Sequence, residues 1–194
     1  MKTTNKLLIT ATAIFLWSCG GQNSNDPAAK ADSVNEAVTD SAQSAGIPMA
    51  APAEDDAKFA VDAANGGMAE VQLGQLAQSK ATDPKVKEFG QMMVTDHSKA
   101  NEELKTLAAS KNITLPAAPS EANQKTEADL TSKSAADFDK AYIKQMVKDH
   151  EATVKLFEDG QKNVKDADIK AFIDKTLPVL RTHLEQSKSL DKAK

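Results

Sequence analysis

Four segments of the chain place apolar residues at every third or fourth position, which is the period of an α-helix that buries one face. These segments span roughly residues 57–80, 82–111, 134–163 and 166–190. At 1.5 Å per residue, each helix would be about 35 to 40 Å long. Helices of such similar length pack side by side, so the pattern predicts an all-α fold, a four-helix bundle over residues 57–190.

The connections between these helices predict their directions. Short turns join the first helix to the second and the third to the fourth, whereas residues 112–134 separate the second from the third. This long segment, with a short helix expected after Ser120, can run the length of a bundle and would make the second and third helices parallel. An up-down-up-down bundle remains the alternative. Residues 89–97 and 142–150 share aromatic, Met-Val and Asp-His positions, and parallel copies would place these at matching heights.

The first residues predict export and a lipid anchor. Residues 1–18 have early lysines followed by an apolar run too short to span a bilayer, as in a signal peptide. The sequence Leu-Trp-Ser-Cys-Gly around Cys19 resembles a bacterial lipoprotein box, which implies that Cys19 becomes a lipidated N-terminus in the outer membrane. Residues 19–56 carry few large apolar side chains, so they predict a disordered linker between the anchor and the bundle.

The three histidines of the chain all lie in the apolar stripes of predicted helices. His97 and His150 each follow a methionine by four residues and an aspartate by one. Lengths along the helices place both near Glu70 at mid-bundle and place His183 about 10 Å away. The candidate metal ligands are Glu70, Met93, His97, Met146, His150 and His183, with Asp96 and Asp149 as groups that would orient the imidazoles. Imidazole with thioether favours copper, and imidazole with glutamate suits zinc, iron or copper.

The same residues also fit a purely structural role, which is the preferred interpretation from sequence. A core histidine can be satisfied by an aspartate or a backbone carbonyl, and methionine commonly fills gaps in helical cores. A carboxylate-bridged di-iron centre is not expected, because it requires Glu-x-x-His pairs. The positions three before the histidines hold Val94, Val147 and Leu180.

Several functional classes are excluded or disfavoured by composition and motifs. A single cysteine excludes an internal disulfide framework, a CxxC redox pair and thiolate-cluster sites. A formal charge of −4 argues against a nucleic-acid partner, which would need a basic face. The sequence has no phosphate-binding glycine motif and no recognisable serine-based catalytic triad. We therefore do not expect an enzyme.

Four phrases resemble a bacterial domain-of-unknown-function family, number 4142, described as predicted outer membrane proteins. They are FAVDAANGGMAEVQLGQLA, VKEFGQMMVTDHSKANEELKTLA, FDKAYIKQMVKDHEATVKLF and FIDKTLPVLRTHL, within residues 59–187. The resemblance implies a ferritin-like four-helix fold and an envelope location, and it supplies no activity.

Together these observations predict an outer-membrane-anchored lipoprotein, facing the periplasm or the cell surface. Its ferritin-like bundle would have a non-catalytic binding or envelope-stress role with an unknown ligand. The alternative is a transition-metal binding or redox protein that holds copper, iron or zinc through His, Met and Glu side chains.

Overall fold

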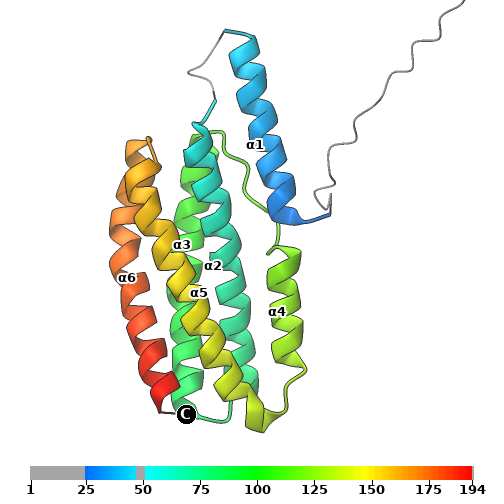
Figure 1. Ribbon diagram of the computed structural model, residues 1–194, viewed down its shortest axis with the longest axis vertical. Coiled ribbons are helices and arrows are strands. Elements are labelled where there is room, and N and C mark those ends of the chain that lie inside the picture. Colours follow the sequence, from blue (N-terminus) through cyan, green and yellow to red (C-terminus); the bar gives the residue numbers. More distant parts are fainter. Residues whose placement is uncertain (1–24, 47–50, 194) are drawn as a thin grey trace, which may run out of the picture.

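The computed structural model describes residues 25–46 and 51–193. Within them the fold has six helices and no strand, which confirms the predicted all-α class. The helices are α1 (Pro27–Ser44), α2 (Glu54–Lys80), α3 (Pro84–Ser110), α4 (Glu121–Thr131), α5 (Ala135–Asn163) and α6 (Ala167–Lys192) (Figure 1). None of these helices is both long and apolar enough to cross a membrane. The predicted signal peptide and Cys19 lie outside the described residues.

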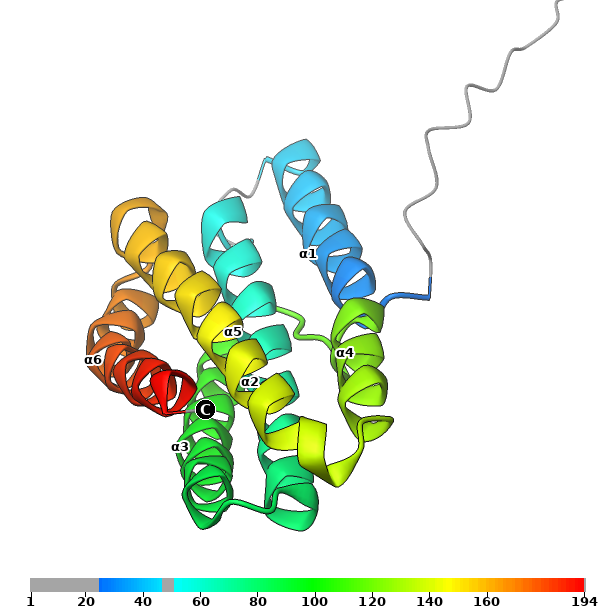
Figure 2. The ribbon, with the colours of Figure 1, turned by 60° about the horizontal axis from the view of Figure 1, so that its bottom comes forward.

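The four long helices α2, α3, α5 and α6 form a bundle in which α3 and α5 are parallel (Figures 1 and 2). At one end, the amide of Thr82 donates to the carboxylate of Asp139 at 3.0 Å, which joins the start of α3 to the start of α5. At the other end, the amide of Lys165 donates to Asp56 at 2.6 Å, which joins the starts of α2 and α6. The structure therefore has the predicted parallel arrangement and not the up-down-up-down alternative.

The helices begin where local capping chemistry favours it. Asp83, Ser134 and Asp166 accept hydrogen bonds from amides in the first turns of α3, α5 and α6. Ser120 caps α4 in the same way, so the short helix expected in the middle segment is present. Before it, Asn112 adopts a left-handed conformation with φ of 58°, which turns the chain after α3.

The disorder predicted for residues 19–56 is wrong for the part that forms α1. Asp26 caps this helix, and the buried Asn35 exchanges two hydrogen bonds with the backbone of Thr114, at 3.0 and 2.8 Å. Ala31 is also buried, against the bundle. The segment has little apolar surface, as its composition indicates, but polar contacts with a distant part of the chain hold it on α2 and the connection to α4.

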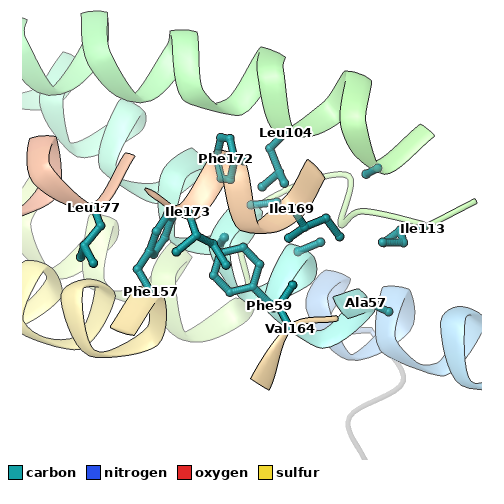
Figure 3. Packing of buried hydrophobic residues seen from close by; sticks show 14 of the residues in the cluster. Ala57, Phe59, Leu104, Ile113, Phe157, Val164, Ile169, Phe172, Ile173 and Leu177 are labelled. Atoms are coloured by element: carbon teal, nitrogen blue, oxygen red, sulfur yellow. The ribbon is translucent and has the colours of Figure 1, made fainter. Parts of the chain in front are cut away.

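Two apolar clusters fill the interior of the bundle, one toward each end. The first surrounds Phe59 and Phe157, whose rings meet edge to face at 5.1 Å, and includes the start of α6 (Figure 3). The second surrounds Tyr142 and Phe138, near the starts of α3 and α5. Along every long helix, the residues of the two clusters are separated by a short interval that contains buried polar side chains. This polar layer is the unusual feature of the core.

Helices α2 and α3 approach each other closely beside this layer. A Cβ atom built on Gly74 would lie 2.7 Å from the carbonyl oxygen of Gly90, and one on Gly90 would lie 2.8 Å from the Cβ of Ala77. Glycine is therefore required at position 74 by the neighbouring backbone.

Candidate metal centre

Each of the four long helices contributes one buried polar side chain to the layer between the apolar clusters. These are Glu70 from α2, His97 from α3, His150 from α5 and His183 from α6. Their exposed fractions are 2%, 4%, 0% and 1%. Ionisable groups are almost never buried this completely without a partner, so their arrangement calls for a physical explanation.

The three imidazole rings lie close together. The ring centroids of His97 and His150 are 5.7 Å apart, those of His97 and His183 are 5.3 Å apart, and those of His150 and His183 are 5.4 Å apart. One ring nitrogen from each residue lies within 4.8 Å of one from each of the others. Three nitrogen donors from three helices therefore converge on one small volume.

The outer nitrogens of His150 and His183 are fixed by hydrogen bonds. Nδ1 of His150 donates to the backbone carbonyl of Met146 at 2.9 Å. Nε2 of His183 donates to the carboxylate of Asp96 at 2.9 Å. Because a carbonyl only accepts, the proton of His150 is on Nδ1, and Nε2 keeps a free lone pair. A carboxylate partner places the proton of His183 on Nε2 in the same way, which leaves the lone pair on Nδ1.

The carboxylate of Glu70 contacts the rings of His97 and His150. Its Oε2 is 3.1 Å from Nδ1 of His97, and its Oε1 is 3.6 Å from Nδ1 of His150. Neither carboxylate oxygen has a hydrogen-bond partner of good geometry among the described residues. Glu70 thus sits on the outer side of the imidazoles, and only the three histidines form the cluster of converging donor atoms.

The inner nitrogens have no partner. Nε2 of His97, Nε2 of His150 and Nδ1 of His183 are buried and accept no hydrogen bond from any described residue. A buried polar atom without a hydrogen-bond partner is unfavourable by about 1–3 kcal/mol, and three such nitrogens come together here. A positive ion at the centre would satisfy all three.

Burial also keeps the imidazoles neutral. It lowers the pKa of His97 well below the usual 6.5, and the neighbouring imidazoles add to this effect. Burial lowers the pKa of His150 to about 4 and also lowers that of His183, where the hydrogen bond to Asp96 opposes the shift. Neutral imidazole is the form that binds metal ions. Burial, together with the charge of Asp149, raises the pKa of Glu70 well above its ordinary value, and a nearby cation would favour the carboxylate again.

The structure brings His183 into the cluster, although lengths measured from the end of α6 place it about 10 Å away. The turn between α5 and α6 is the better reference, because the C-terminus of α6 need not be level with the other helices. Measured from that turn, His150 and His183 lie about 20 and 24 Å along their helices at 1.5 Å per residue. This difference is less than one helical turn.

The structure also places the four remaining candidates. Met93 and Met146 are fully buried in the apolar cluster beside the histidines, and the contact made by Met146 is through its backbone carbonyl. Asp96 lies beside an imidazole, that of His183 on α6. Asp149 accepts a hydrogen bond from Gln145 at 2.8 Å. The carbonyl of Met146 as a histidine partner carries no signal in the sequence.

One solved structure resembles the fold, and no curated protein matches the sequence. The structure is described as CopM in the Cu(II)-bound form. Its alignment has a TM-score of 0.62 and covers 71% of this chain and 96% of that chain, at 17% sequence identity. At this identity the likeness shows a shared helical-bundle fold.

The comparison with protein families covers most of the chain. Residues 36–190 match a domain of unknown function, DUF4142, which agrees with the resemblance seen in the four helical phrases. The matched range includes α2, α3, α5, all of α6 but its last two residues, and every residue of the polar layer. The chain belongs to the DUF4142 family.

Proposed function

We propose that the bundle binds a single transition-metal ion through ring nitrogens of His97, His150 and His183, and that copper is the preferred metal. The observation that carries this proposal is the convergence of three buried, unpartnered imidazole nitrogens within 4.8 Å of one another. A satisfied structural histidine would have partners on both nitrogens. Here His150 and His183 each make one hydrogen bond through the outer nitrogen, His97 contacts Glu70, and the remaining nitrogen of each ring has no partner among the described residues.

The dimensions fit a metal ion after a small contraction. A point equidistant from three atoms that are 4.8 Å apart lies 4.8/√3, or about 2.8 Å, from each of them. Imidazole nitrogens bind zinc at about 2.0–2.1 Å, and copper distances are similar. Each ring therefore needs to move inward by at most about 0.7 Å, which small rotations of the side chains can supply.

The outer partners match those of metal-binding histidines. Such residues usually donate their second ring N–H to a carboxylate or a backbone carbonyl, which fixes the ring and makes the other nitrogen a better ligand. Asp96 and the carbonyl of Met146 have this role for His183 and His150. Glu70 lies at the corresponding position behind His97 and carries the charge that would balance a bound cation.

Copper is favoured by the donor set. Affinity for nitrogen donors rises along the first-row divalent metals to copper and falls again at zinc, and imidazole suits copper, zinc and iron alike. Cuprous copper also accepts three ligands, which is the number offered here. The Cu(II)-bound form of CopM, a protein of the same general fold, supports this choice. The observed geometry thus favours metal binding over the packed structural histidines preferred from sequence.

Metal analysis of untagged, full-length protein tests the proposal. After loading with copper and gel filtration, we expect about one ion per chain, and each of His97→Ala, His150→Ala and His183→Ala should lower the affinity at least about 100-fold. Leu180→Ala is the matched control, since it removes a side chain of 2% exposure from α6, three residues before His183. It should weaken folding and leave the stoichiometry unchanged. Copper that stays bound to the triple histidine variant would refute the site.

We further propose that the protein is an outer-membrane lipoprotein, anchored through Cys19, that holds its metal without catalysis on a ferritin-like bundle. The signal-like segment and the sequence around Cys19 support the anchor. The long connection between the parallel helices α3 and α5 supports the ferritin-like topology. Incorporation of labelled palmitate that disappears in Cys19→Ala would support the anchor, and incorporation that persists would contradict it.

A further inference from the structure

The three imidazoles are not anchored alike. Glu70, which contacts both His97 and His150, is 2% exposed, and the other partner of His150 is a backbone carbonyl inside α5. Asp96, the partner of His183, has a side chain that is 39% exposed. His97 and His150 are therefore held by groups that water does not reach, whereas His183 is held by a carboxylate at the surface.

The Asp96–His183 hydrogen bond closes the seam between α3 and α6 at the level of the histidines. Helix α6 lies at the edge of the bundle (Figures 1 and 2) and is attached to α5 by two ion pairs on either side of His183. These are Arg181–Glu158 at 2.8 Å and Lys188–Glu151 at 2.7 Å. Toward α3, the polar contact at this level is the hydrogen bond itself, and behind it lie the three inner nitrogens.

Helix α6 also lacks a backbone hydrogen bond at Pro178, five residues before His183. Pro178 has no N–H to donate to the carbonyl of Asp174, and proline in a helix interior favours a bend. The hydroxyl of Thr182 donates to the carbonyl of Pro178 at 3.1 Å, a contact that also bends helices slightly. His183 thus follows a point at which the backbone of α6 is held by fewer hydrogen bonds.

We propose that the Asp96–His183 hydrogen bond is the latch of the metal site: an ion reaches and leaves the three nitrogens through the α3–α6 seam when this bond breaks and His183 turns aside. His97 and His150, whose contacts are with buried groups, form the fixed half of the site. The latch rests on the proposed metal binding. It adds the path that the ion takes, through the α3–α6 seam, and the ligand that moves, His183.

Exchange kinetics test the latch with the full chain and copper. Stopped-flow mixing measures loading from a weak copper chelator, and transfer to a strong chelator measures release. Because opening requires the bond to break, we expect Asp96→Ala to speed loading by about tenfold. Release should speed up further, by about 100-fold or more, because the loss of the carboxylate also weakens His183 as a ligand by about 10–100-fold. Asp96→Asn keeps an acceptor for Nε2–H and should give intermediate rates.

Glu103→Ala is the matched control. Glu103 lies on the same helix, its side chain is also 39% exposed, and it bonds Lys175 across the same seam without contacting a histidine. Its removal should leave both rates within about twofold of wild type. Circular dichroism establishes that each variant is folded before its rates are compared.

Other outcomes would overturn the latch. If Asp96→Ala speeds release alone and weakens binding accordingly, Asp96 only strengthens His183 as a ligand. If neither rate changes, or if Glu103→Ala changes them equally, the ion uses another path. A wild-type protein that binds no copper, zinc or iron would refute the metal site itself, and with it the latch.

Discussion

Replacing Gly74 with alanine tests the close packing of α2 on α3 that supports the polar layer. The added methyl carbon would lie 2.7 Å from the carbonyl oxygen of Gly90, 3.0 Å from Cγ2 of Val94 and 3.1 Å from Cβ of Met93. Two of these atoms belong to or adjoin the backbone, so side-chain rotation cannot relieve the contact, and the helices must move apart.

The expected change in stability is a difference between two effects. Alanine is favoured over glycine in a helix interior by about 1 kcal/mol. Overpacking of a well-packed interior costs about 1–3 kcal/mol, so Gly74→Ala should have a net loss of about 1 kcal/mol. Gly66→Ala is the control on the same helix, because its methyl carbon would meet only the hydroxyl oxygen of Thr153, at 3.9 Å. That variant should gain up to about 1 kcal/mol.

Urea and thermal unfolding of metal-free protein, followed by circular dichroism, measure both variants. A difference of about 2 kcal/mol should separate their midpoints by about 4–8 °C in a chain of this size. Helix separation at Gly74 also draws Glu70, one turn earlier, away from His97, so Gly74→Ala should weaken copper binding while Gly66→Ala should not. If Gly74→Ala is as stable as Gly66→Ala, the close approach of the two helices is not what requires glycine there.

Three further predictions concern pH and the docking of α1. Burial lowers the pKa of His150 to about 4, so between about pH 6.5 and 4 the unfolded chain binds a proton that the folded chain does not. The free energy of unfolding of metal-free protein should therefore fall as the pH is lowered through this window, and urea titrations that show a flat profile would contradict this. For Glu70 the pH dependence has the opposite sign. Because its pKa is raised in the folded chain, the free energy of unfolding falls as the pH rises above about 4.5. Glu70→Gln should consequently be more stable than wild type by about 1–3 kcal/mol at pH 8 without metal and should bind copper more weakly, as calorimetry would measure. Asn35→Ala removes both hydrogen bonds to Thr114, at a cost of about 1 kcal/mol, and should make the chain before α2 more sensitive to limited proteolysis; unchanged cleavage would mean that α1 is held otherwise.

Local chemistry made most of the helical framework predictable. Capping residues such as Asp83, Ser134 and Asp166 act within their own first turns, so their effect can be read from adjacent positions. Helix α1 was missed for the opposite reason. Asn35 and Thr114 are 79 positions apart, and neither the spacing nor the composition of residues 19–56 indicates that they meet.

The sequence indicates which residues form the candidate site more fully than it indicates their contacts. His97 and His150 were placed together because their Asp-His phrases repeat on parallel helices. The pairing of Asp96 with His183 was not foreseen, although helix geometry explains it. Adjacent residues of a helix point about 100° apart, so when His97 faces the interior, Asp96 faces the next helix.

The polar layer draws one side chain from each long helix, and the segment from Glu70 to His183 includes most of the bundle. An ion bound there would cross-link positions far apart along the chain, and closing such long loops removes more freedom from the unfolded chain than closing short ones. Helices α3, α5 and α6, which carry the three histidines, could then no longer detach independently. The metal-loaded protein should open as one cooperative unit, whereas α6 of the metal-free protein should exchange its amide hydrogens earlier than the rest.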